Sequence, residues 1–539
     1  MPPRAVSVAG WGLALASVGF SLVARIVHRG PYYPGFDVVG AANGLFLLST
    51  RSPWAAVREV FYQSRHYSAP FPYFGALSAL LPGALTALCP WEYWWHAVTF
   101  VLFGVTLGLI GRAVAVPLRD AWVVLLAWGA SGALLSFSLA GLPWVNGFLP
   151  HALALWIVLD ARLRRRWLAT VVLCLVASEL PWHVYELGKT ACLVFLLGAF
   201  LVSEAPLGIR GIWFVTGAVQ LVQVFAYPSA HVDAFTGLRP LGPAETWARI
   251  ATLGGMLGTG WLDVPMLVGS ASVVCLSLGR ERRLLALLFA VQLGLTLALA
   301  MRATAASEVR PRRFLMVDLY ALALVASAWR DGVGVPGQRR SLRGVLLALL
   351  VVGNVWQLVA TLRFVRTPFE RTVTHDYGFT LPFVESQVDY MVRFADVDWS
   401  RELATRVDAG EKPLLVYDLG AYDENYSNPE ALLERLYVHL GHRRFVDSVF
   451  AFGSTACRHA CLPIHPMHEL APFLDGIRAG RPVDRSVIVG YYVAPQAFDE
   501  PVFTREREQM IRAIRQRFTM ELESPADAKY VRFRLGADA

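Results

Sequence analysis

The sequence predicts a multi-pass α-helical membrane protein that carries an α/β domain at its C-terminal end. Composition is the first reason: 55% of the 539 residues are hydrophobic and 17% are charged, and the mean hydropathy is +0.45. The second reason is a succession of apolar segments near the roughly 20 residues that cross a bilayer core. The third is a change after residue 362 to mixed polar sequence. We therefore expect a membrane domain over residues 1–362 and a separate domain over residues 363–539.

About eleven segments are apolar and close enough to the required length to be membrane spans. Residues 5–24 carry no charge and lack an A-x-A-type cleavage site, so we interpret them as a retained first helix and not as a cleaved signal. The predicted spans lie near residues 6–24, 93–111, 121–140, 146–160, 167–182, 189–203, 211–227, 251–275, 284–301, 314–329 and 344–362. The segment 71–88 is also apolar but contains Pro82. It is either a further span or a helix in the membrane interface.

Arginines between the spans predict the orientation. With the N-terminus in the cytoplasm and 71–88 not spanning, the inner loops contain GRAVAVPLRD, ARLRRRW, GRERR and RDGVGVPGQRRSLRG, whereas outer turns such as LPWVNG are poor in arginine. This is the distribution of the positive-inside rule. Two outer segments, ARIVHRG and RPRRF, are exceptions, so their arginines need another role. An odd number of spans then places residues 363–539 outside the cytoplasm.

Residues 363–539 have the pattern of a compact α/β domain. The strand-like runs PLLVYDLG, RFVDSVFAF and SVIVGYYVA alternate with helix-like runs. In NPEALLERLYVHLG we expect Asn428 as N-cap, Pro429 at the first helical position and Gly441 as the stop, and TREREQMIRAIRQRF begins after the cap Thr504. About 175 residues is a common size for one domain.

The formal net charge of +8 does not indicate nucleic-acid binding. Residues 363–539 hold 22 Lys+Arg and 26 Asp+Glu, a balance of −4, so the first 362 residues hold the remaining 27 and 15, a balance of +12. The basic excess therefore lies in the membrane part, where loop topology accounts for it.

Ionisable residues gather at the predicted outer face. The first outer loop, residues 25–92, contains Asp37 in YYPGFDVVG, an amphipathic stretch at 53–63 that suits an interfacial helix, and Arg65 and His66. Two later turns, ASELPWHVYELGKT and EVRPRRF, contribute Glu179, His183, Glu186, Lys189, Arg310, Arg312 and Arg313. Ionisable groups beside spans either face a shared cavity and serve function or are interface anchors that extend into water.

In this order the segments resemble the GT-C superfamily of integral-membrane glycosyltransferases. Asp37 matches the acid after the first span in that family, and the His/Lys-Pro-Pro-like segment of the family is matched by HYSAPFPYFGALSAL. The family's helix ending in GRRL is matched by VTLGLIGRAV, and its PDALL helix by GLPWVNGFLPHALALWIVLDARLRRRW. The LLTKG turn is matched by YELGKTA and the PRYLL run by RPRRFLMVDLY. The resemblance covers residues 1 to about 330. The sequence departs from the family at Val38, where many members have a second acid, and at Asn146 and its neighbours, where an acid is expected.

The resemblance implies sugar transfer from a polyprenyl-phosphate carrier to a hydroxyl of a glycan, lipid or protein acceptor, at the outer face of a bacterial inner membrane. Asp37 is then the general base, with a helix cap or turn residue as its alternative. Lys189, Arg312 and Arg313 are the candidates for the carrier phosphate, because Arg makes paired charge-assisted hydrogen bonds to phosphate, and Arg65 and His66 are the next candidates. Lys189 is equally an interface anchor in the alternative interpretation. No cofactor is required by these motifs; a divalent cation is an open alternative.

Other motifs and classes have weaker support. DVD at 396–398 matches the metal-binding D-x-D of nucleotide-sugar enzymes, but no nucleotide sugar is expected outside the cytoplasm. Cys457 and Cys461 favour a local disulfide outside the cytoplasm over a zinc site. A transporter would show repeated halves or charges within spans; no repeat is visible and Asp318 is the clearest such acid. A membrane-anchored polysaccharide-binding or assembly protein is the remaining alternative.

Overall fold

The computed structural model of the protein describes the greater part of the chain. The described residues are 3–27, 39–66, 76–91, 93–131, 134–135, 138, 143–184, 186–226, 242–248, 250–251, 282–302, 315–331, 339–366, 379–380, 383–384, 400–417, 430–453, 465–478, 488–492, 512, 516, 520–522 and 530–535. All structural statements below concern these residues.

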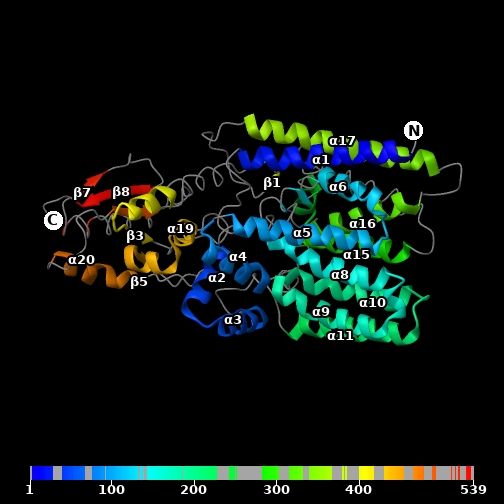
Figure 1. Ribbon diagram of the computed structural model, residues 1–539, viewed down its shortest axis with the longest axis horizontal. Helices are drawn as coiled ribbons and strands as arrows, with labels where there is room; N and C mark the ends of the chain where they lie inside the picture. The colour runs from blue at the N-terminus through cyan, green and yellow to red at the C-terminus, as the bar shows by residue number, and fades with distance from the viewer. Residues whose placement is uncertain are drawn as a thin grey trace.

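The described part of residues 1–366 is helical, and most of its helices lie alongside one another along the long dimension of the molecule (Figure 1). They are α1 (Pro3–Val27), α5 (Trp94–Ala113), α6 (Trp122–Ala130), α8 (Phe148–Leu159), α9 (Trp167–Val184), α10 (Cys192–Leu201), α11 (Leu207–Ala226), α15 (Arg283–Arg302), α16 (Leu315–Asp331) and α17 (Arg339–Arg366). Short 3₁₀ helices, η1 (Leu118–Asp120), η2 (Pro143–Gly147), η3 (Leu163–Arg165) and η4 (Glu186–Ala191), connect several of them. These helices fall on the predicted apolar segments, except that the predicted span at 251–275 lies outside the described residues.

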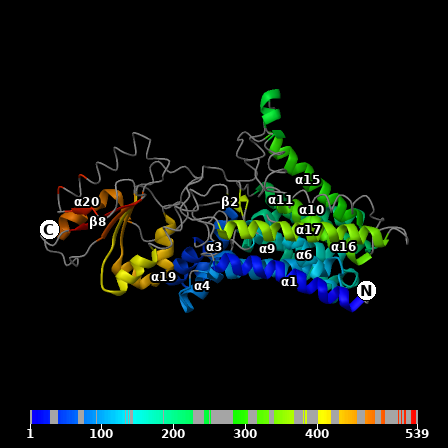
Figure 2. The same cartoon turned by 90° about the horizontal axis from the view of Figure 1, so that it is seen from above.

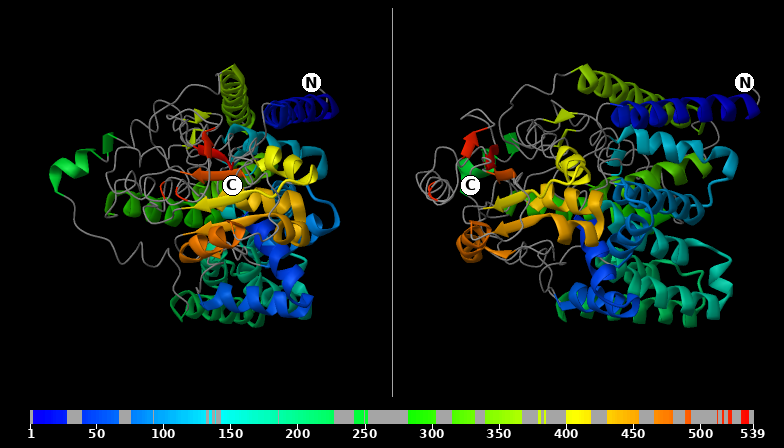
Figure 3. Two further views of the ribbon diagram at one scale, coloured as in Figure 1. Left: turned by 90° about the vertical axis from the view of Figure 1, so that its left-hand side faces the viewer. Right: turned by 60° about the vertical axis from the view of Figure 1, so that its left-hand side comes forward.

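Helix α16 is the centre of this bundle. Its side chains from Leu315 to Ala328 are buried on every side, and they belong to one apolar cluster with α5, α6, α8 and α10. At the periphery, α1 and α17 lie side by side at one edge of the bundle, and α9, α10 and α11 lie at the opposite edge (Figures 1 and 3). A helix that is apolar all round is either buried or in contact with lipid, and both kinds are present here.

Exposed apolar side chains mark the surface that lipid would cover. On α9 they include Val172 and Val176, and on α11 Val215, Val219 and Val222, in each case at the helical spacing of one face. In the described part of the chain, three helices are long and apolar enough to cross a membrane: Trp94–Ala113, Trp167–Val184 and Leu207–Val224. The predicted count of about eleven spans stays a prediction.

Three further helices lie between the bundle and the C-terminal region: α2 (Val39–Thr50), α3 (Pro53–His66) and α4 (Ala76–Leu88). Helix α3 is the predicted amphipathic helix, and the hydroxyl of Ser52 caps its start by accepting from Ala55 N at 3.3 Å. Helix α4 contains Pro82, and its 13 residues span about 20 Å, less than the hydrocarbon core. The described residues 76–88 are therefore too short for a complete span, and the two interpretations of the segment 71–88 stay predictions.

The described residues after 400 build a six-stranded sheet with the strand order β5-β4-β3-β6-β8-β7. The strands are β3 (Leu414–Tyr417), β4 (Phe450–Gly453), β5 (His465–Pro466), β6 (Ile488–Tyr492), β7 (Met520–Leu522) and β8 (Tyr530–Leu535), with α19 (Glu430–Ser448), η8 (Met467–Glu469) and α20 (Leu470–Arg478) between them; a hairpin of β1 (Phe379–Thr380) and β2 (Phe383–Val384) precedes the sheet. Strands β5, β4, β3 and β6 are parallel to one another, and β8 pairs antiparallel with both β6 and β7. In register, Leu415 faces Ala451 on β4 and Gly490 on β6.

The sequence predicted β3, β4, β6 and α19 with two corrections, but it did not predict β1, β2, β5, β7, β8 or α20. The runs PLLVYDLG and SVIVGYYVA contain β3 and β6 as expected. In RFVDSVFAF, however, the strand starts only at Phe450, since Phe445 is fully buried on α19 as part of the core. Gly441 does interrupt α19 with φ 74° and ψ 164°, but helical residues resume after it. The domain boundary at 363 and the side of the membrane stay predictions, and the predicted helix after Thr504 lies outside the described residues.

Helix α19 lies against α2 and reaches α4, so the C-terminal sheet region shares a core with these helices (Figures 1 and 2). Leu45 on α2 belongs to the same apolar cluster as Leu433 and Leu436 on α19. The rings of Phe46 and His442 meet edge to face at 6.1 Å. The residues immediately after Asp37 are therefore tied to the C-terminal region.

Candidate functional site

Lys189 is the predicted site residue that the structure defines best. It lies in η4, its side chain is only 7% exposed, and its ammonium nitrogen stands 4.1 Å from the centroid of the Trp182 ring on α9. Burying an ammonium group is costly without compensation, and the face of a tryptophan is the strongest aromatic partner for a cation. This burial does not fit the interpretation of Lys189 as an interface anchor that extends into water.

The turn that carries Lys189 is held close to the start of α8. A side-chain carbon at Gly188 would lie 2.5 Å from Cγ of Pro150, which real contacts do not tolerate, so only glycine fits here without a shift. The hydroxyl of Thr190, on the other side of Lys189, lies 3.0 Å from Nε2 of His151. The sequence around Lys189 is therefore set by packing against α8 on both sides.

His151 joins three elements at this end of the bundle. Its Nδ1 lies 2.7 Å from the hydroxyl of Tyr320 on α16, while Nε2 lies 3.0 Å from Thr190 on η4. Sequence reasoning missed both His151 and Tyr320. The available signal was a histidine inside the apolar run FLPHALALW, because polar residues within membrane segments mark packing networks or function.

A second buried network fixes the end of α9 beside Lys189. Asn146 on η2 donates to the hydroxyl of Ser78 on α4 at 3.0 Å, and Ser78 donates to the carbonyl of Val184 at 2.7 Å. Asn146 stands where the GT-C resemblance expects an acid. Its amide nitrogen donates to the hydroxyl of Ser78, and an ionised carboxylate, which only accepts hydrogen bonds, could not make this contact.

Glu179 and His183 are both half-buried on α9. They are four residues apart and therefore lie on the same face of the helix, one turn from each other. Trp182, the ring under Lys189, lies on the same last turn of α9. The structure thus brings Glu179, His183 and Lys189 to one end of the bundle.

The other predicted site residues are not placed in this way. Glu186 belongs to η4 and Arg65 and His66 to the last turn of α3, and only their backbone is described. Asp37, Arg310, Arg312, Arg313, Cys457 and Cys461 lie outside the described residues. The predicted convergence of Asp37 with the arginines, and the predicted disulfide, therefore stay predictions.

One buried acid bears on metal binding. Asp318, the acid noted within a predicted span, is fully buried in the first turn of α16, and the Ser131 hydroxyl donates to it at 3.4 Å. An acid in a first helical turn interacts favourably with the helix dipole. Within the described ranges, no three His, Cys, Asp or Glu side chains group as ligands for one metal ion.

No protein-family model and no curated protein sequence matches the chain. Two crystal structures of ArnT from Cupriavidus metallidurans are similar to it, both at 12% identity: the form bound to undecaprenyl phosphate, with a TM-score of 0.49 over 98% of each chain, and the apo form, with 0.46 over 98% of this chain and 99% of that chain. At this identity and these TM-scores the neighbours carry no argument about activity, and the proposals below depend on residues of this chain.

Proposed function

We propose that the protein is a membrane glycosyltransferase that moves a sugar from a polyprenyl-phosphate carrier to an acceptor hydroxyl at the outer face of the membrane. The observation that carries the proposal is Lys189, a cation buried against Trp182 at the end of an apolar helix bundle. A lipid phosphate requires a cation at the end of an apolar surface, and Lys189 offers that combination. Lysine binds phosphate as a compact point charge.

The motif order supports the remaining roles. In the proposed reaction, Asp37 takes the proton of the acceptor hydroxyl while the acceptor oxygen bonds to the anomeric carbon of the sugar. The bond from that carbon to the phosphate oxygen breaks, and the carrier leaves as polyprenyl phosphate. Lys189, Arg312 and Arg313 stabilise the phosphate charge as it develops.

Several residues are proposed to bind around this centre. Glu179 and His183 lie toward the end of α9 that precedes η4, the segment that carries Lys189, and their side chains suit hydrogen bonds to sugar hydroxyls. The remaining candidates for the phosphate and sugar are Arg65, His66, Glu186 and Arg310. A divalent cation is an alternative helper for the phosphate, and loss of transfer on chelation would support it.

Donor binding tests Lys189 directly. For the purified protein in lipid nanodiscs, Lys189→Gln should weaken binding of a polyprenyl-phosphate sugar about tenfold to a hundredfold, since a charge-assisted hydrogen bond contributes about 1.5–3 kcal/mol. Lys189→Arg should retain most of the affinity. Arg51→Gln is the matched control, because Arg51 pairs with Glu59 at an exposed position where such pairs contribute about 0–1 kcal/mol.

Turnover separates catalysis from binding. Asp37→Asn keeps the shape and capping ability of the side chain but not its capacity to accept a proton. We expect near-normal donor affinity and transfer reduced about a hundredfold or more. Transfer at the normal rate would make Asp37 structural and move attention to Glu179 or Glu186. If Lys189→Gln, Arg312→Gln and Arg313→Gln all leave donor affinity unchanged, the carrier site is elsewhere.

A further inference from the structure

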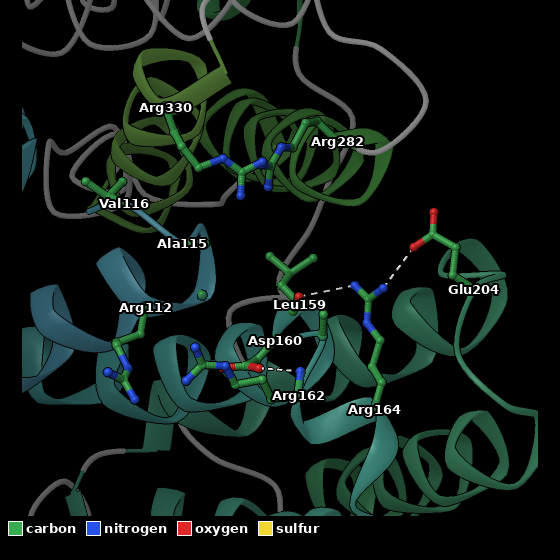
Figure 4. A pocket seen from close by; sticks show the side chains of 12 residues that line it. Arg112, Ala115, Val116, Leu159, Asp160, Arg162, Arg164, Glu204, Arg282 and Arg330 are labelled. Atoms are coloured by element: carbon green, nitrogen blue, oxygen red, sulfur yellow. Dashed lines mark hydrogen bonds and ion pairs between the residues drawn. The ribbon is translucent and has the colours of Figure 1, made fainter. Parts of the chain in front are cut away.

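A pocket lies at the opposite end of the helix bundle from Lys189. Two helices connect the two ends. Helix α8 extends from His151, beside the Lys189 turn, to Leu159 at the pocket, and α16 extends from Tyr320, the partner of His151, to Arg330 at the pocket. At 1.5 Å per residue the two stretches rise about 12 Å on α8 and about 15 Å on α16. The pocket has a volume of about 500 Å³ and is drawn in Figure 4.

Arginine side chains dominate the walls of this pocket. Its charged lining residues are Arg112, Arg162, Arg164, Arg282, Arg330, Asp160 and Glu204. Among the described residues that line the pocket, five guanidinium groups against two carboxylates leave a formal excess of three positive charges. The arginines come from the end of α5, the η3 turn, the start of α15 and the end of α16, segments far apart in the chain. Loop topology explains arginines at this end, but it does not require them to converge on one pocket.

Both carboxylates of the pocket already have structural tasks. Asp160 accepts from the indole nitrogen of Trp156 at 3.0 Å and from the backbone nitrogen of Arg162 at 2.7 Å, so it caps the chain where α8 ends. Glu204 pairs with Arg164 at 2.8 Å at the exposed rim, since its side chain is 66% exposed. Neither arrangement changes the positive excess of the pocket as a whole.

Backbone carbonyl groups hold two of the arginines in place. Arg330 donates to the carbonyl of Val114 at 3.0 Å, and Arg164 donates to the carbonyls of Val158 and Leu159, each at 3.2 Å. These carbonyls are at the ends of α5 and α8, where the helix leaves acceptors unsatisfied. The guanidinium groups are thus positioned before any ligand arrives, which reduces the entropy that binding costs.

Arg282 and Arg330 extend toward each other from α15 and α16 (Figure 4), and Arg282 is only 7% exposed. Two cations directed into one partly enclosed space repel each other, and an anion between them offsets that repulsion. The planar guanidinium fork matches phosphate oxygens with paired hydrogen bonds.

We propose that this pocket binds a phosphate group, supplied either by the headgroup of an anionic phospholipid or by a free phosphate ion. This site is distinct from the carrier site proposed at Lys189, and it binds its ligand without catalysing a reaction. If the bundle spans the membrane as predicted, a phosphate bound at its end lies at the level of lipid headgroups.

Lipid and phosphate titrations of the full-length protein in detergent test the proposal. Native mass spectrometry would count bound dioleoyl-phosphatidylglycerol and dioleoyl-phosphatidylcholine, with inorganic phosphate as competitor. We expect the anionic lipid to bind more tightly than the zwitterionic lipid, and the double variant R282Q/R330Q to lose about tenfold or more in affinity, because two charge-assisted contacts are removed. Displacement by millimolar phosphate would assign the site to free phosphate, and resistance to displacement would assign it to the lipid headgroup.

Arg119→Gln is the matched control, since Arg119 lies on η1 at the same end of the bundle, outside the pocket, with its side chain 76% exposed. Its affinity should remain within a factor of about two. If the double variant does not fold, Glu204→Gln gives an independent result: it raises the positive excess by one charge and should tighten binding. Equal affinity for the two lipids together with no phosphate binding, or a Glu204→Gln variant without tighter binding, would overturn the proposal.

Discussion

The contact between α2 and α4 allows a quantitative prediction for Gly44→Ala. At Gly44 an added methyl group would lie 2.8 Å from the carbonyl carbon of Ala79, closer still to its oxygen, and 3.2 Å from Cα of Gly83. Ordinary contact begins at 3.4 Å, so the two helices have to separate by at least 0.6 Å, the difference between 3.4 and 2.8 Å. The opposing atoms are backbone, and no rotamer change relieves the overlap. Small residues at such crossings allow helices in membranes to approach closely.

The expected cost follows from two opposing effects. Overpacking of a well-packed interface costs about 1–3 kcal/mol, while replacing a helical glycine by alanine gains about 0.5–1 kcal/mol. We therefore expect Gly44→Ala to lower the free energy of unfolding by about 1–2 kcal/mol. Because α2 also packs against α19, the same change should increase protease cleavage near the start of the C-terminal region.

Reversible unfolding in mixed detergent and SDS micelles, followed by tryptophan fluorescence, measures this effect. The control is Gly108→Ala on α5, where an added methyl group meets nothing within 4 Å. It should leave the protein equally stable or stabilise it by up to about 1 kcal/mol. A Gly44→Ala variant as stable as Gly108→Ala would refute the close approach of α2 and α4.

Three further predictions concern other parts of the chain. Ala115 has a left-handed backbone with φ 53°, which costs a non-glycine residue about 1–2 kcal/mol, so Ala115→Gly should stabilise the protein by about 1 kcal/mol in the same unfolding assay. Burial raises the pKa of the Tyr437 hydroxyl. The protonated hydroxyl therefore contributes its full stabilisation of the folded state below the unfolded pKa of about 10, and this contribution is lost as the pH rises toward the raised pKa. The Tyr437→Phe variant should therefore lose less stability than the parent protein at alkaline pH. A reporter that is active only in the cytoplasm should stay inactive when fused after Ala539, and an active fusion would reverse the predicted topology.

The helical architecture of the first part of the chain followed from local sequence alone. Runs such as WLATVVLCLVASELPWHV need no tertiary information, because an apolar run of this length has to satisfy its backbone hydrogen bonds internally within a bilayer. Lys189 was also identified from its local pattern, YELGKTA, and the structure adds that its ammonium group is buried against Trp182. Strands β3 and β6 followed from short runs rich in β-branched and aromatic residues.

The tertiary structure decided which distant residues meet. Nothing local in FLPHALALW states that His151 contacts Tyr320, 169 positions away, or Thr190 on η4, since a hydrogen bond between helices depends on how they pack. The strand in RFVDSVFAF is delayed to Phe450 because burial of Phe445 on α19 outweighs its local β preference. The arginine pocket is the clearest case: each arginine alone is an ordinary loop charge, and only the packing of α5, α8, α15 and α16 brings five of them around one space.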